Sequence, residues 1–101
     1  MLESLNEETF ARLLNTKFVL HAEPGQDSEL ELVEVSSGPV EKEGQGDCFS
    51  LIFRGPTETL FQQRIYNFEH PQIGSFDLFI VPIRRHTDGF YYEVIFNRQT
   101  H

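Results

Sequence analysis

Hydrophobic and polar residues alternate along most of the chain after Thr16, as in strands that bury one face. Turn-forming pairs such as Pro24-Gly25, Gly55-Pro56 and Asp88-Gly89 interrupt this alternation at short intervals. The pattern therefore predicts six strands, over residues 17–22, 28–35, 48–54, 65–70, 75–83 and 90–97.

Helical spacing occurs before the strands, with apolar residues on one face at Phe10, Leu13 and Leu14. Asn6 is the preferred N-cap, because its side-chain oxygen can accept a hydrogen bond from a free amide of the first turn. Ser4, with Glu7 three residues later, is the alternative cap. Asn15 tolerates a left-handed backbone and would end the helix. We predict one helix over about residues 6–15.

One helix and six short strands, without helical crossovers between the strands, predict a mainly β, antiparallel domain. The chain has 101 residues, which is the size of a single domain spanning residues 1–101. A small six-stranded barrel and a sandwich both fit this pattern.

Two strands depart from simple alternation. The phase changes at Leu32-Val33, which predicts a bulge or a strand covered on both faces. The strand over residues 75–83 is apolar on both faces, whereas a closed barrel needs only an apolar interior. We expect the N-terminal helix to cover part of the outer face, and a protein partner or a second copy to cover the rest.

The charge is unbalanced, with 16 acidic and 8 basic side chains and a net charge of −8. The excess lies in residues 1–47, where eleven acidic residues accompany three basic ones. An acidic surface repels phosphate groups, so we expect binding neither to nucleic acid nor to a membrane. The first residues lack the apolar region of a signal peptide, and Cys48 has no cysteine partner. These features favour a cytoplasmic protein.

The sequence contains no nucleophile elbow, phosphate-binding loop or zinc-protease motif. Its four histidines share no metal-ligand spacing. We therefore expect no metal and no cofactor, and we assign no catalytic residue. The sequence favours a protein without catalysis and leaves enzyme activity open.

Five residues are candidates for binding: Arg54, Glu69, His70, Phe79 and Tyr91. Arg54 precedes a Gly-Pro turn, where an arginine usually bonds loop carbonyls or a carboxylate. Together with Glu69 and His70 it could form an acid–base cluster, although neighbouring strand residues point to opposite faces. In the structural alternative, His70 bonds a backbone group and holds the turn at Pro71. Phe79 and Tyr91 belong to the apolar outer face.

The basic pair Arg84-Arg85 is too small for a nucleic-acid patch. We predict that the pair lies in a loop, where it would be either solvated or bound to a carboxylate of a partner.

Several segments together resemble one bacterial domain family that is known only as a domain of unknown function. The matching segments are residues 8–10, 30–35, 49–56, Tyr66, 69–71, Gly74, 78–82 and 92–97. The most specific are Phe53-Arg54-Gly55-Pro56 and Glu69-His70-Pro71. The resemblance brings no established activity. It implies that the gene lies near genes for phage-tail-like and tail-collar-like proteins, and hence that the protein has an accessory role in a particle.

The favoured function is a non-catalytic protein-binding or structural accessory module. The alternatives are a small barrel that binds a small molecule in its mouth, and a hydrolase-like enzyme that uses His70.

Overall fold

The computed structural model describes residues 5–37 and 48–97. Its elements are α1 (Glu7–Ala11), β1 (Lys17–Glu23), β2 (Gln26–Ser37), β3 (Cys48–Gly55), β4 (Arg64–His70), β5 (Gly74–His86) and β6 (Gly89–Asn97). The predicted strands are all present. Of the connection expected over residues 36–47, Ser36 and Ser37 belong to β2, and the remainder lies outside the described residues.

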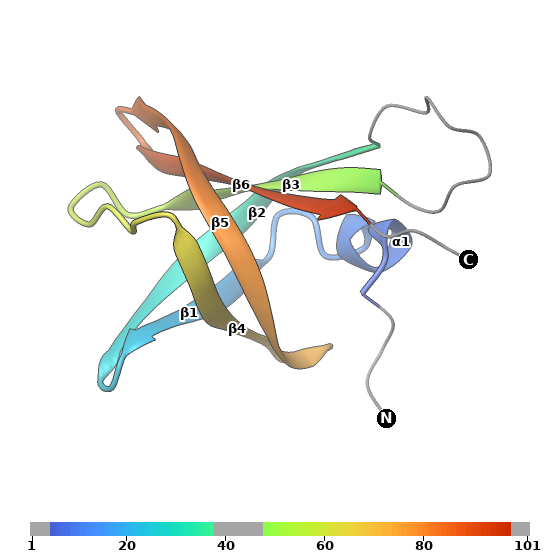
Figure 1. The fold of residues 1–101 in the computed structure, drawn as a ribbon, viewed down its shortest axis with the longest axis horizontal. Helices are drawn as coiled ribbons and strands as arrows, with labels where there is room; N and C mark the ends of the chain where they lie inside the picture. The colour runs from blue at the N-terminus through green and yellow to red at the C-terminus, as the bar shows by residue number, and fades with distance from the viewer. Residues whose placement is uncertain (1–4, 38–47, 98–101) are drawn as a thin grey trace.

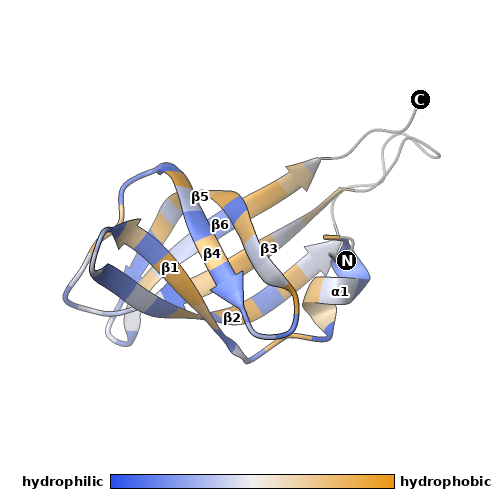
Figure 2. Cartoon of the chain, turned by 90° about the horizontal axis from the view of Figure 1, so that it is seen from below, coloured by the Kyte–Doolittle hydropathy of each residue, from blue (hydrophilic) through white to orange (hydrophobic). Residues whose placement is uncertain are grey.

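The six strands close into an antiparallel barrel in the order β1-β2-β3-β6-β5-β4, with β4 pairing back to β1 (Figure 1). The sequence allowed either a barrel or a sandwich, and the structure is a barrel. Inward-facing and outward-facing residues alternate, so hydrophobic and hydrophilic colours alternate along the strands in Figure 2.

Two long strands turn the corners of the barrel. The first part of β2 pairs with β1 and the second with β3, and the pairing register shifts between Leu32 and Glu34. Likewise, β5 pairs first with β4 and then with β6, with a shift between Pro82 and Arg84. Bulges let one strand pass from one sheet direction to the other. The bulge predicted at Leu32-Val33 is therefore confirmed, and its role is to bend the strand.

Aromatic side chains from the connecting segments fill the two ends of the barrel. At one end, Phe10 of α1 is fully buried between Phe18, Phe49, Phe76 and Phe96, at ring-centroid distances of 5.5–6.3 Å. At the other end, Phe61 lies against Tyr66 and Tyr92. The Tyr92 hydroxyl accepts a hydrogen bond from the Phe61 amide at 2.9 Å. The barrel interior is thus a packed core.

The predicted N-cap of α1 is confirmed, whereas the predicted length of the helix and its predicted position on the outer face are wrong. The Asn6 side chain accepts a hydrogen bond from the Thr9 amide at 2.8 Å, and Asn15 has a φ of 70°. However, regular helix ends at Ala11, and α1 closes an end of the barrel instead of covering the outer face. The reason is Phe10, whose large ring buries more apolar area inside the barrel than it could on the outside.

No helix among residues 5–37 and 48–97 has both the length and the apolar character needed to cross a membrane.

Candidate functional site

The outer surface of β4, β5 and β6 carries exposed hydrophobic side chains. Ile65 lies opposite Phe79 in the β4–β5 ladder, and Val81 follows Phe79 on the same face of β5. Ile83 lies in the β5 bulge, and Ile95 faces outward on β6. The exposed fractions are 61% for Ile65, 47% for Phe79, 42% for Ile83 and 64% for Ile95. We call these five residues, Ile65, Phe79, Val81, Ile83 and Ile95, the outer apolar face.

A second feature is a polar cluster where the β5–β6 hairpin meets β3. Arg54 lies opposite Tyr91 in the β3–β6 ladder and bonds Glu31 of β2. Its Nη1 lies 3.6 Å from Oδ2 of Asp88. The Tyr91 hydroxyl donates to both oxygens of Asp88, at 3.1 and 2.9 Å, and these hydrogen bonds are the largest cause of a lowered pKa for Asp88. Arg54 and Tyr91, both candidates from the sequence, therefore meet here and hold three strands and a turn together.

His70 lies inside the barrel and is 3% exposed. Its Nδ1 accepts from the Gln72 amide at 3.1 Å, which places the proton of the neutral ring on Nε2. Nε2 then donates to Oγ1 of Thr16 at 3.0 Å, and Thr16 Oγ1 donates to the Leu13 carbonyl at 2.6 Å. Burial lowers the pKa of His70 and so favours this neutral form. The relay ties the β4–β5 turn to the segment that follows α1.

Glu69 points to the opposite face from His70, and Arg54 lies in the separate cluster at β3. The acid–base trio considered from the sequence is therefore not assembled. Both ring nitrogens of His70 already have protein partners, so the geometry gives it no free nitrogen for a substrate.

Sequence reasoning missed the true partner of Glu69, which is His21. The His21 ring bridges two carboxylates, with Nδ1 2.8 Å from Asp27 and Nε2 3.0 Å from Glu69. These hydrogen bonds raise the pKa of His21, and the hydrogen bond to Asp27 contributes most. The side chains join β2, β1 and β4 across the outer surface. The hairpin register that sets His21 opposite Asp27 was the available signal for half of this bridge.

In the described ranges, no group of three His, Cys, Asp or Glu side chains is arranged to hold a metal ion. His21 illustrates the reason, because its two carboxylates bind opposite sides of the ring and do not converge on one point.

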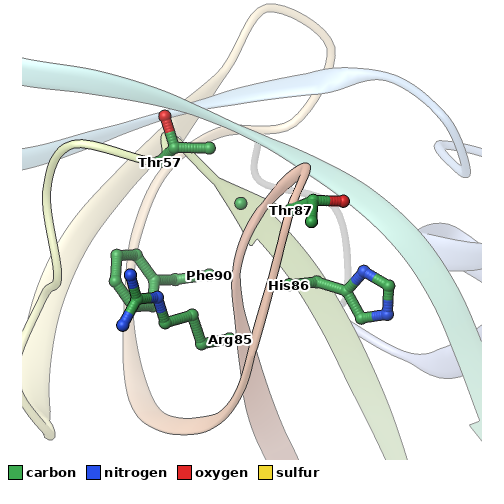
Figure 3. A pocket seen from close by; sticks show the side chains of 6 residues that line it. Thr57, Arg85, His86, Thr87 and Phe90 are labelled. Carbon is green, nitrogen blue, oxygen red and sulfur yellow. The ribbon is translucent and has the colours of Figure 1, made fainter.

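A surface hollow of about 480 Å³ lies beside the β5–β6 hairpin (Figure 3). Its lining residues are Thr57, Arg85, His86, Thr87, Gly89 and Phe90. In Figure 3, Arg85 lies beside the Phe90 ring, whereas His86 and the Thr87 hydroxyl point to the other side of the hairpin. The polar groups therefore do not converge as they do in a catalytic site.

A family model matches most of the chain. No curated protein and no solved structure matches it. Residues 5–96 match the family described as a domain of unknown function (DUF6916), and the chain therefore belongs to that family.

Proposed function

We propose that this protein is a non-catalytic protein-binding module of the bacterial cytoplasm. In this proposal it is an accessory of a larger assembly, of the phage-tail-like kind that the family resemblance implies. The binding surface is the outer apolar face, and the residues that contribute most to binding are Phe79 and Ile65.

The observation that carries this proposal is the exposure of paired large hydrophobic residues on the outside of a barrel whose inside is full. Phe79 and Ile65 are direct cross-strand neighbours, so their side chains form one continuous apolar surface. Apolar groups clustered on an exterior are typical of protein interfaces, where aromatic residues contribute most of the binding energy.

The test is copurification from the native host with the wild-type chain, Phe79→Glu and Leu14→Glu. Leu14 is a matched control, because it is an exposed hydrophobic residue at the α1 end of the molecule. We expect a discrete partner that Phe79→Glu loses and Leu14→Glu retains. Partners that are equally retained by all three chains, or by none, would contradict the proposal.

The small-molecule alternative has one observation in its favour, the hollow beside the β5–β6 hairpin, because its volume is that of an ordinary ligand site. The barrel lumen gives no support, since aromatic rings fill it. A compound that raises the melting temperature of the wild type but not of Arg85→Ala would favour this alternative.

A further inference from the structure

The first half of β5 has a strand on one side only. From Gly74 to Ile80, β5 pairs with β4, but it pairs with β6 only from Val81 onward. No other backbone hydrogen bond reaches residues 74–80 from the parts of the chain that the structure describes. In Figure 1, β5 and β6 lie together at the upper left and separate toward the right, where β6 runs toward α1. We call the side of residues 74–80 that faces away from β4 the free edge of β5.

The free edge presents backbone groups at alternate residues. The side-chain amide of Asn67 on β4 donates to the Phe76 carbonyl at 3.3 Å, so this carbonyl points toward β4. Successive carbonyls of a strand point to opposite sides, so those of Ser75, Asp77 and Phe79 point to the free edge. Such a row of backbone groups is a template for a further strand.

Residues 74–80 lack the usual protection against strand addition. Proteins block such edges with proline, with lysine or with a bulge. The segment contains no proline, lysine or arginine. The bulge of β5 lies beyond it, between Pro82 and Arg84, where β5 already pairs with β6. The free edge is therefore suited to pair with another chain.

Hydrophobic side chains flank the position of an added strand. Phe79 on β5 and Ile95 on β6 both face outward and are exposed. Each lies two residues from the pair at which the two strands separate, Val81 with Glu93. A residue of an added strand that lies opposite Phe79 is thus placed between two exposed apolar side chains, and an apolar residue fits this position best.

The next outward residue of β5 is acidic. Asp77 is exposed and accepts a hydrogen bond from Asn67 at 3.1 Å, but among the described residues no basic side chain lies at ion-pair distance from it. A lysine or arginine opposite Asp77 would gain a cross-strand ion pair. A second copy of the chain fits less well, because each copy carries a net charge of −8 and its own free edge is acidic.

We propose that an extended segment of the partner protein adds to the free edge of β5 as an antiparallel strand. The segment carries a lysine or arginine opposite Asp77 and an apolar residue opposite Phe79. Main-chain hydrogen bonds give this binding mode its affinity, and alternate side chains give it specificity. The inference rests on the proposed function, and it names the kind of segment that binds beside the outer apolar face.

The probe for this proposal is a synthetic peptide, acetyl-Thr-Val-Thr-Lys-Thr-Val-Thr-amide. Its alternate residues are valine, lysine and valine in either direction, so a lysine opposite Asp77 always places a valine opposite Phe79. One version is methylated on the valine and lysine amides, which face the free edge in the proposed pairing. A matched version is methylated on the threonine amides, which face away from it.

Binding to the full chain is measured by the chemical-shift changes of its backbone amides. The wild type should bind the unmethylated and the threonine-methylated peptides alike. It should bind the valine- and lysine-methylated peptide more weakly by about tenfold or more, because the hydrogen bonds to the edge are lost. Equal binding of all three peptides, or no binding up to millimolar peptide, would overturn strand addition.

The predicted ion pair is tested by charge reversal. A peptide with glutamate in place of lysine should bind the wild type several-fold more weakly, and Asp77→Lys should reverse this preference. Glu23→Lys makes the same change on the β1–β2 hairpin and should keep the wild-type preference. Circular dichroism establishes that both variants are folded. An unchanged preference in Asp77→Lys would overturn the proposed pairing.

Two further results separate this inference from its alternatives. A wild-type dimer in sedimentation velocity that the peptide dissociates would show that a second copy occupies the free edge, and would overturn the choice of a partner protein. A partner that Phe79→Glu loses, together with equal binding of the three peptides, would overturn strand addition alone and leave the proposed function standing.

Discussion

At the scale of single residues, neighbours in sequence have unrelated roles. Glu69 and His70 are adjacent, yet one joins His21 on the outside while the other holds Thr16 and Gln72 inside. A strand turns successive side chains to opposite faces, so the two environments differ completely. His70 therefore has a structural role, because its ring links the segment after α1 to the β4–β5 turn.

We expect His70→Ala to lower the free energy of unfolding by about 1–3 kcal/mol, because it leaves the Gln72 amide without its partner. Urea denaturation measures this change. His86→Ala is the control, since the His86 side chain is 60% exposed and should contribute about 0.5 kcal/mol or less. Equal effects of the two substitutions would contradict the role given to His70.

His70, which is buried, and His21, which bridges two carboxylates, should stabilise the fold in opposite pH ranges. Burial lowers the pKa of His70 from 6.5, so the unfolded chain binds the proton more tightly. The stability that His70 contributes to the folded state is therefore complete above pH 6.5, and it falls as the pH drops through the folded-state pKa. Bonds to Asp27 and Glu69 raise the pKa of His21 from 6.5, so its stabilisation is complete below that pH and is lost as the pH rises.

Urea denaturation at about pH 5 and about pH 8 tests this contrast. His70→Asn should cost more stability at the higher pH, and His21→Asn more at the lower pH. The same pH trend for both substitutions would refute the assignment of these two protonation states.

At the scale of elements, the short helix matters through one side chain. α1 has five residues, too few to be stable alone, and Phe10 anchors it by filling the end of the barrel. The connection before β4 closes the other end in the same way, with Phe61.

Phe10→Ala should therefore cost about 3–5 kcal/mol and detach α1 from the barrel. The measurement is the free energy of unfolding, together with hydrogen exchange of the α1 amides. Leu14→Ala is the control, because Leu14 is 39% exposed and should cost far less. Unchanged protection of the α1 amides in Phe10→Ala would show that another contact holds the helix.

Two hairpin glycines provide a second test at this scale. Gly25 and Gly89 both have positive φ, at 79° and 143°. A Cβ on Gly25 meets nothing within 4 Å, so Gly25→Ala should cost about 1–2 kcal/mol, from backbone strain alone. A Cβ on Gly89 would lie 2.1 Å from the Gly55 carbonyl oxygen and would force β3 and β6 apart. Gly89→Ala should thus melt at a clearly lower temperature than Gly25→Ala, and the reverse order would contradict the packing of this hairpin.

The elements themselves were largely predictable, because alternation and turn residues are local signals. The six strands, the Asn6 cap, the left-handed backbone at Asn15 and the bulge after Leu32 all follow from residues close together in the chain. The sequence placed Arg84 and Arg85 in a loop, because they lie beside turn-forming residues. In the structure, β5 continues to His86 and both arginines lie on the strand.

The candidate site was less predictable, because its contacts depend on strand order. The Arg54 cluster joins Glu31, Asp88 and Tyr91, and the bridge at His21 joins residues 48 positions apart. A periodic pattern says which face a side chain occupies, but not which strand lies beside it. The end of the barrel filled by Phe10 was missed for the same reason.

At the scale of the whole molecule, the barrel is full inside and varied outside. Its interior is filled and its ends are closed by Phe10 and Phe61, so we place the proposed binding surface on the outer apolar face. With a net charge of −8, we expect the chain not to bind phosphate backbones. These features together support a module that works through contacts with other proteins.

The central claim is that a protein partner covers the outer apolar face. Photo-crosslinking in the native host tests it most directly, with a benzophenone side chain in place of Phe79 and, as the control, in place of Leu14. Both positions are exposed and apolar, so they differ mainly in the surface to which they belong. The account predicts a discrete crosslinked product from position 79 that position 14 does not give. No product from position 79, or the same products from both positions, would contradict it.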